Sequence, residues 1–463
     1  MKKFICLLLA FLLSLQLAGC SVSDGRLSWN GWPWESSSEL PRKDDTEKPL
    51  LPQEGQEEPQ RVEVEVGALE GDLKQLPTGL AFEGGPYAYT QQQGGYECLE
   101  TQEQQCYLQM EQAVFQISAQ QDSRGYYPTN HITVQNAQLD EAQLRKVISA
   151  FTADHPNVFW LANTFGYAYT GQDTEVVLYS LLAPQECAEK QELLNQELQS
   201  IFVGEQAIAE RMSEFGRELY LHDWLLARVG YDEAAAQDSQ DWQAFTAYGA
   251  LVEGEAVCEG YARALQLLMS YAGISCRLAT GVSQEDLHMW NVVQIDGQWY
   301  HLDPTWNDSA NMPRYDYFNV TDEIISLDHT LDPNYSVKDA SDTAQRYNLN
   351  IPACTATQAN YFYQKAERIN ALDEETDRRI ITALRTQAVS GAATISFLLG
   401  DGLDYEMTVS QLFLQSPYKF LYYVQRANEG LESSQQIDGG SVLFAEVEAQ
   451  RAVTVKITYQ NAS

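Results

Sequence analysis

The stretch that decides the fold is GEAVCEGYARALQLLMSYA, from Gly254 to Ala272. Its apolar side chains recur at helical spacing, and Gly273, a residue type common at helix C-termini, follows directly. The pattern predicts a helix that begins near Cys258 and buries one face. The side chains on that face are Tyr261, Ala264, Leu265, Leu268 and Ala272.

Cys258 would lie in the first turn of this helix. A helix N-terminus presents N–H groups without intrahelical acceptors and a partial positive charge, which together favour a thiolate over a thiol. The same N–H groups can stabilise an oxyanion on a carbonyl that the sulfur attacks. The position therefore gives Cys258 two properties of a nucleophile, although a buried structural cysteine fits the helix alone equally well.

A second stretch, HMWNVVQIDGQWYHLD from His288 to Asp303, has the pattern of a β-hairpin. Two β-rich runs flank Asp296–Gly297, and this arrangement is the strongest short-range hairpin signal. A two-residue turn there sets Asp303 opposite Trp290, with His288 two residues along on the same face. Diagonal neighbours of this kind lie about 7–8 Å apart. The hairpin would therefore hold an imidazole beside a carboxylate that orients it.

No spacing rule by itself brings Cys258 to His288. Residues 276–279 form a short strand candidate between the helix and the hairpin, and this strand would return the hairpin to the side of the helix. A nucleophile, a base and an orienting carboxylate would then be in place for acyl transfer through a thioester.

Three blocks resemble the core of the transglutaminase-like superfamily: GEAVCEGYA at residues 254–262, HMWN at 288–291 and YHLDPTW at 300–306. Their order also matches, as do the separations of 30 residues from Cys258 to His288 and 15 from His288 to Asp303. The resemblance implies an α+β, papain-like fold in which a cysteine-bearing helix packs on an antiparallel sheet. It further implies that Cys258 is the nucleophile, His288 the general base and acid, and Asp303 the residue that orients the imidazole.

Other residues of these blocks allow alternative interpretations. His301 lies on the same predicted face as Asp303 and could be the base, but side chains two apart on a strand rarely point at one atom. A metal site formed by His288, His301 and Asp303 would need three converging ligands with outer-shell support. We expect no metal and no other cofactor.

Further candidates surround the predicted site. Tyr248, ten residues before the nucleophile, is a candidate second oxyanion donor, with a core tyrosine as the alternative. Trp290 and Trp306 are expected to line the cleft rather than to take part in the chemistry. His222 is expected to be a packing residue with a satisfied hydrogen bond, and Cys276 a buried apolar side chain.

Composition limits the class of protein. The chain has 463 residues, enough for two or three domains, and its 65 Asp and Glu against 29 Lys and Arg give a net charge of −36. A surface this acidic repels polyphosphate, which excludes nucleic-acid and anionic-lipid binders. Its 8 cysteines are too few for a disulfide-stapled scaffold, although Cys98 and Cys106 could bridge in an oxidising compartment.

The first twenty residues predict an export signal. Met1–Lys3 is positively charged, residues 4–15 are apolar, and LAGC at 17–20 resembles the bacterial lipobox. The resemblance implies lipidation of Cys20, which would anchor the chain to the outer face of a membrane without spanning it. An ordinary signal peptide that is cut nearby is the alternative. Residues 21–60 are rich in Ser, Glu, Pro and Gln and predict a disordered tether.

The remaining chain divides into three predicted segments: an N-terminal α+β domain at 61–204, the catalytic domain at 205–350 and a small C-terminal α+β module at 351–463. No pattern in the last segment carries chemistry, and none in the chain indicates an oligomeric state. The periodicity predicts helices at 140–151, 188–202, 205–229, 357–370 and 374–385, and strands at 165–169, 175–182, 393–399, 418–425, 442–447 and 453–459.

Together these observations predict a surface-anchored cysteine enzyme that acts on a peptide or protein amide. Water as the acceptor of the acyl group gives a peptidase or amidase, and an amine gives a cross-linking transglutaminase. We favour hydrolysis, because water is abundant outside the cell and nothing in the sequence marks an amine-acceptor tunnel. The alternative from another class is a binding or scaffold lipoprotein that retains the fold without turnover.

Overall fold

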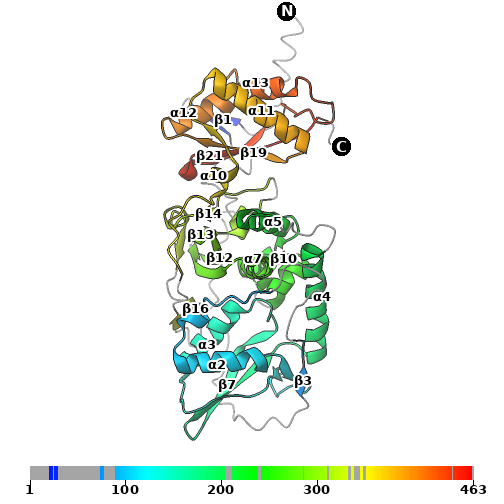
Figure 1. Cartoon of the computed structure of the whole chain (residues 1–463), viewed down its shortest axis with the longest axis vertical. Helices are drawn as coiled ribbons and strands as arrows, with labels where there is room; N and C mark the ends of the chain where they lie inside the picture. Colours follow the sequence, from blue (N-terminus) through cyan, green and yellow to red (C-terminus); the bar gives the residue numbers. More distant parts are fainter. Residues whose placement is uncertain are drawn as a thin grey trace, which may run out of the picture. The chain divides into compact units, whose positions relative to one another are not determined.

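The computed structural model describes residues 73–77, 89–203, 211–237, 241–284, 286–309, 312–331, 351–440 and 442–460 (Figure 1). The chain forms two compact units, one of residues 51–308 and 317–360, the other of 1–50, 309–316 and 361–463. The stretches predicted as separate domains at 61–204 and 205–350 thus lie in one unit, apart from residues 309–316. None of the described helices combines the length and the apolar composition needed to cross a bilayer.

Four short strands are described by their backbone only. Strands β1 (Cys20–Ser23) and β2 (Arg26–Trp29) form an antiparallel pair, as do β16 (Tyr335–Val337) and β17 (Gln345–Tyr347). The first pair departs from the tether expected there. The rest of the predicted tether, the export signal and the side chain of Cys20 lie outside the described residues.

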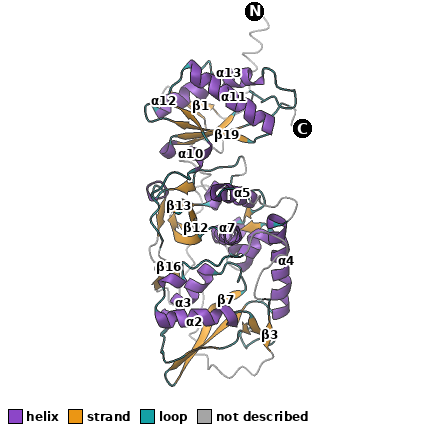
Figure 2. Ribbon diagram, viewed as in Figure 1, coloured by secondary structure: helices purple, strands orange, loops and turns teal. Residues whose placement is uncertain are grey.

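Helix α7 (Cys258–Ala272) lies against a five-stranded antiparallel sheet, which confirms the predicted α+β architecture (Figure 2). The helix ends at Gly273, whose φ of 70° gives the left-handed C-cap that glycine accommodates. The side-chain amide of Asn291 donates to the carbonyl of Ala262 (2.9 Å) and joins the sheet to the helix. In spatial order the strands are β14 (Phe318–Val320), β13 (Gln298–Leu302), β12 (Asp286–Ile295), β11 (Cys276–Ser283) and β15 (His329–Leu331).

The β12–β13 hairpin has the predicted turn and register. Asp296 and Gly297 adopt φ angles of 49° and 78°, as a type I′ turn requires. Pairing of the two strands ends at Leu302. Asp303 therefore leaves the strand and becomes the N-cap of the short helix α8 (Pro304–Asn307).

Helix α5 (Glu214–Leu226) packs on α7. It begins later than predicted because Ser213 caps it and accepts a hydrogen bond from the backbone N–H of Gly216 (3.1 Å). The chain then reaches the start of α7 through short elements, among which β9 and β10 pair in parallel. These elements are β9 (Gly230–Tyr231), α6 (Glu233–Gln237), η2 (Trp242–Phe245), the π-helix η3 (Gly249–Glu253) and β10 (Glu255–Ala256). After the hairpin, α9 (Asp322–Ile325) precedes β15.

The N-terminal part of the same unit contains a second sheet, in which β5, β8 and β6 lie in this order and β7 also pairs with β8. The predicted helix capped by Asp140 and the two predicted strands on either side of residues 171–172 are confirmed. The elements are β3 (Leu73–Gln75), η1 (Tyr96–Cys98), α2 (Thr101–Ala113), β4 (Gln116–Ser118), β5 (Tyr127–Pro128), β6 (Ile132–Val134), α3 (Glu141–Asp154), β7 (Leu161–Thr170), β8 (Asp173–Ser180) and α4 (Pro184–Phe202).

Buried polar contacts join this N-terminal part to α7. The side-chain amide of Gln266 donates to the carbonyl of Ala153 (2.9 Å), and the guanidinium of Arg263 donates to the carbonyl of Thr152 (2.7 Å). Gln92 donates to Ser270 Oγ (3.0 Å). The C-terminal end of α3 thus satisfies its last carbonyls with side chains of α7.

Cys98 and Cys106 do not form the disulfide considered from the sequence. Both are free thiols: Cys98 Sγ lies 3.2 Å from the carbonyl of Gly94, and Cys106 is buried in α2. Burial raises the pKa of both thiols.

The smaller unit contains a four-stranded sheet in the order β18, β19, β21, β20. The helix predicted at 357–370 is wrong, since only five of its residues are helical and β18 follows. The strand predicted at 418–425 is also wrong: Phe420, Tyr423, Val424 and Ala427 are buried at helical spacing and form α13. The elements are α10 (Tyr361–Lys365), β18 (Glu367–Ile369), α11 (Glu374–Ser390), β19 (Thr394–Leu399), α12 (Tyr405–Val409), the π-helix η4 (Ser410–Leu414), α13 (Lys419–Asn428), β20 (Leu443–Val447), η5 (Glu448–Gln450) and β21 (Ala452–Lys456).

Candidate active site

Cys258 is the first residue of α7 and is partly exposed. The N–H of the preceding residue, Val257, donates to the carbonyl of Ala244 (3.0 Å). Gly260 lies against the same carbonyl, and a Cβ at this position would come within 2.3 Å of its oxygen. Only glycine permits so close an approach. The glycine two residues after the cysteine therefore fixes the start of the helix and, with it, the position of the thiol.

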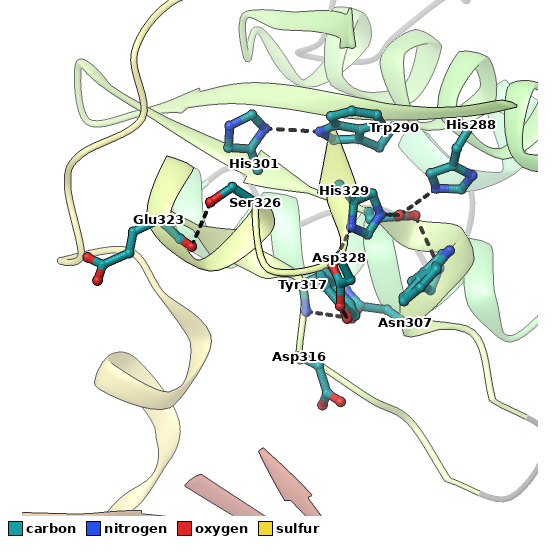
Figure 3. A network of polar contacts seen from close by, with 12 residues as sticks. His288, Trp290, His301, Asn307, Asp316, Tyr317, Glu323, Ser326, Asp328 and His329 are labelled. Carbon is teal, nitrogen blue, oxygen red and sulfur yellow. Dashed lines mark hydrogen bonds and ion pairs between the residues drawn. The ribbon is translucent and has the colours of Figure 1, made fainter. Parts of the chain in front are cut away.

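The imidazole of His288, on β12 and labelled in Figure 3, lies beside the carboxylate of Asp303. His288 Nε2 and Asp303 Oδ2 are 2.7 Å apart. The other carboxylate oxygen accepts the backbone N–H groups of Thr305 (2.9 Å) and Trp306 (3.1 Å). The helix cap thus holds the carboxylate in place. Asp303 makes this contact from the N-cap of α8, after it has turned out of the strand.

Cys258 lies near enough to His288 to act on its imidazole and to raise its pKa. Because Nε2 is bonded to Asp303, Nδ1 is the ring nitrogen that remains for the sulfur. Burial lowers the pKa of His288, but the charge and hydrogen bond of Asp303, together with Cys258, raise it to about 10. For Asp303, burial has the opposite effect and raises the pKa, but His288 and His329 hold this pKa below its usual range. The pair therefore favours an imidazolium beside a carboxylate.

The structure adds a second histidine that sequence reasoning missed. His329, on β15, lies with its Nε2 3.1 Å from Asp303 Oδ2 and its Nδ1 2.6 Å from Asp328 Oδ1 (Figure 3). Its side chain is fully buried. Strand β15 pairs with β11 at the edge of the sheet, and no local pattern marks that pairing. The only sequence signal is an Asp-His pair after the core blocks.

Trp290 and Trp306 both lie against the ring of His288. The Trp290 ring stacks along it at a centroid distance of 6.0 Å, and the Trp306 ring is tilted at 6.2 Å. Trp290 is fully buried, and its Nε1 donates to His301 Nδ1 (3.0 Å). Trp290 therefore packs on the imidazole from the core. This differs from the expectation that it lines an open cleft.

Tyr248 is not brought into this site. Its ring stacks on Phe159 with centroids 4.9 Å apart, and its hydroxyl lies 3.5 Å from the ammonium of Lys190. Burial and a hydrogen bond to Glu253 raise the pKa of Tyr248 to about 12. These contacts are those of the alternative considered from the sequence, a core tyrosine.

The remaining histidines of the core blocks have other partners. His301 Nε2 lies 2.9 Å from Asp322 Oδ1, and burial lowers the pKa of this imidazole, so it is not the base. His222 is buried between Asp223 (2.9 Å) and Asn307 (3.1 Å). In addition, Cys276 is fully buried, as expected.

Two groups of described residues hold possible metal-binding atoms within 4.8 Å of one another: His288, Asp303 and His329, and His301, Asp322 and Cys354. In the second group, Trp290 donates to His301 Nδ1, so the imidazole proton lies on Nε2, where a metal would bind. In the first group, hydrogen bonds account for the arrangement. We therefore assign no metal to either group.

Part of the chain is similar to known proteins. Residues 203–304 match the family described as the transglutaminase-like superfamily. Kyphoscoliosis peptidase of Mus musculus is 26% identical over 205 residues, which cover 41% of this chain and 30% of that protein. The Homo sapiens protein of that name is 33% identical over 95 residues, 18% of this chain and 14% of its own. The chain thus spans less than a third of either relative. A crystal structure of a TGase covers 39% of this chain and 52% of its own at 14% identity and a TM-score of 0.24.

Proposed function

From the premise that residues 203–304 are a domain of the transglutaminase-like superfamily, we propose that the chain is a cysteine enzyme that hydrolyses peptide or protein amides through a thioester. One observation carries the proposal: His288 is hydrogen-bonded to Asp303, and Cys258, the first residue of α7, acts on the same imidazole and raises its pKa. This is the arrangement of nucleophile, general base and orienting carboxylate that acyl transfer requires.

The proposed reaction begins with the sulfur of Cys258 attacking the carbonyl carbon of the substrate amide. The oxyanion that forms lies near the first N–H groups of α7, which have no intrahelical acceptor. The imidazolium of His288 gives its Nδ1 proton to the leaving amine as the C–N bond breaks. A water molecule then attacks the thioester, His288 takes a proton from it, and the thiolate leaves to regenerate the starting pair.

Hydrolysis is proposed over amine transfer, because water is the abundant acceptor at a cell surface. We also propose that lipidation at Cys20 anchors the enzyme there. Metabolic labelling with a fatty acid tests the anchor. We expect the parent protein to be labelled and to appear in the membrane fraction, and Cys20→Ser to be unlabelled and released. Labelling that persists in Cys20→Ser would contradict it.

Alkylation by iodoacetamide near neutral pH tests the reactive pair without any knowledge of the substrate. We expect Cys258 to react faster than a free thiol, and this advantage to disappear in His288→Ala. The matched control is Cys98, a half-buried thiol outside the site whose pKa is raised by burial. Equal labelling of Cys258 and a free thiol would favour the scaffold alternative.

Turnover is tested with a fluorescent casein and, separately, with a glutamine-bearing protein plus a labelled primary amine. Release of peptides by the parent but not by Cys258→Ala supports hydrolysis. Incorporation of the amine without peptide release would replace hydrolysis by cross-linking. If the parent protein neither cleaves nor cross-links, and Cys258 is unreactive, the alternative of a non-catalytic binding protein would be favoured.

A further inference from the structure

The carboxylate of Asp303 lies between two histidines. His288 Nε2 and His329 Nε2 contact the same oxygen, at 2.7 and 3.1 Å. The other oxygen accepts two backbone N–H groups at the start of α8. Asp303 is thus held by four donors in a fully buried position, and only one of the two imidazoles faces the nucleophile.

The contacts of His329 determine its protonation state. Its Nδ1 lies 2.6 Å from Asp328 Oδ1, while its Nε2 faces Asp303. A neutral imidazole has one N–H and one lone pair, so it can donate to only one of two carboxylates. Both contacts are satisfied together only by an imidazolium. The second oxygen of Asp328 accepts the hydroxyl of Tyr317, which leaves both oxygens of Asp328 as acceptors.

The electrostatics agree with this geometry. Burial lowers the pKa of His329, but its hydrogen bonds to Asp303 and Asp328 raise it above its ordinary value. Asp328 is the partly exposed end of the network, with 30% of its side chain accessible. The titratable groups that face His329 are Asp303, Asp328, His288, His301 and Tyr317, and the rings of Trp290 and Trp306 enclose it.

A permanent cation at His329 changes what Asp303 does to His288. An unshared carboxylate would bind the proton of His288 so tightly that the imidazolium would be a poor acid toward the leaving amine. The ring centroids of the two histidines are 5.3 Å apart. Two unit charges at that distance correspond to an upper bound of about 2 pH units at an effective dielectric constant of about 20.

We propose that His329 is a positioning residue of the reaction: a buried imidazolium, kept charged by Asp328, that fixes Asp303 and weakens its hold on the proton of His288. The role rests on the proposed function, because His329 acts through His288 and does not touch the nucleophile. With it, the site forms a row of side chains of alternating charge that runs from Cys258 through His288, Asp303 and His329 to Asp328.

The test is a titration of the His288 imidazole by NMR in protein with isotopically labelled histidine, for the parent, His329→Gln and Asp328→Asn. His329→Gln removes a cation, so we expect the pKa of His288 to rise by about 1–2 units. Asp328→Asn lets His329 become neutral but also removes an anion, so a smaller rise is expected. In a plot of activity against pH, the loss of activity on the basic side should shift to higher pH, more in His329→Gln than in Asp328→Asn.

His155→Gln is the matched control, since His155 is also buried but bonds to the backbone carbonyl of Phe151, outside this network. It should leave the titration of His288 unchanged. A His288 pKa that stays constant or falls in a folded His329→Gln variant would overturn the proposal. If that variant does not fold, a neutral His329 ring in the parent at pH 7, seen in its nitrogen shifts, would overturn it equally. The titration needs no substrate, so an inactive parent protein would refute the proposed function without deciding this result.

Discussion

Replacing Asp303 by asparagine removes the charge that holds the proton on His288 and leaves the side chain nearly the same size. The rise in the pKa of His288 from 6.5 to about 10 corresponds to about 5 kcal/mol in favour of the imidazolium. Burial opposes this rise, and Asp303 makes the largest contribution to it. Without that charge we expect the pKa of His288 to fall by about 3 units or more, and turnover by about 10²–10⁴-fold.

The assay is the rate of Cys258 alkylation by iodoacetamide as a function of pH. In the parent, the neighbouring imidazolium of His288 should make Cys258 react faster near neutral pH than a free thiol does. In Asp303→Asn, the profile should approach that of a free thiol. Asp322→Asn is the matched control, because Asp322 also bonds to a histidine of the sheet, at 2.9 Å, but outside the site. An Asp303→Asn profile that overlays that of the parent would refute the reasoning.

Three further results are expected. Because the folded pKa of His288 is raised above its ordinary 6.5, its contribution to stability is full below about pH 6.5. That contribution is lost as the pH rises through about 10, so urea unfolding should show a decline over this window in the parent and a weaker one in His288→Gln. Gly260→Ala would place a Cβ 2.3 Å from a backbone oxygen, which should cost about 1–3 kcal/mol in thermal or urea unfolding. Gly402→Ala, with no atom within 4 Å of its Cβ, should cost little, and an equal cost for both would argue against the close approach. Tyr248→Phe should lower stability by about 1 kcal/mol with kcat within about two-fold of the parent, whereas a loss on the order of 10²-fold would restore it as an oxyanion donor.

Local sequence patterns were sufficient to predict the helix that carries Cys258 and the hairpin that carries His288. The apolar face of α7 and its terminal glycine follow from helical periodicity, and the Asp296–Gly297 turn fixes the register of the hairpin. Register alone placed His288 and Asp303 near each other. The 2.7 Å contact between them additionally required Asp303 to cap α8, which the following Pro304 permits at a first helical position.

The remaining parts depend on contacts between distant segments. His329 reaches Asp303 only because β15 pairs with the far edge of β11, and no spacing in the chain indicates which edge strand closes the sheet. In the smaller unit, residues 418–425 contain enough aromatic side chains to suggest a strand. Burial at Phe420, Tyr423 and Val424 follows helical spacing instead, so packing against the sheet decided their conformation.

The carbonyls at the end of α3 that accept side chains of α7 have a practical consequence for anyone shortening this protein. Arg263 and Gln266 now donate to the carbonyls of Thr152 and Ala153. A fragment that starts at residue 205 would keep every residue of the proposed triad but strip these acceptors away and expose the apolar flank of the nucleophile's helix. Poor solubility or lack of activity in such a fragment would reflect the loss of these packing contacts. It should not be taken as evidence that the removed part regulates the enzyme.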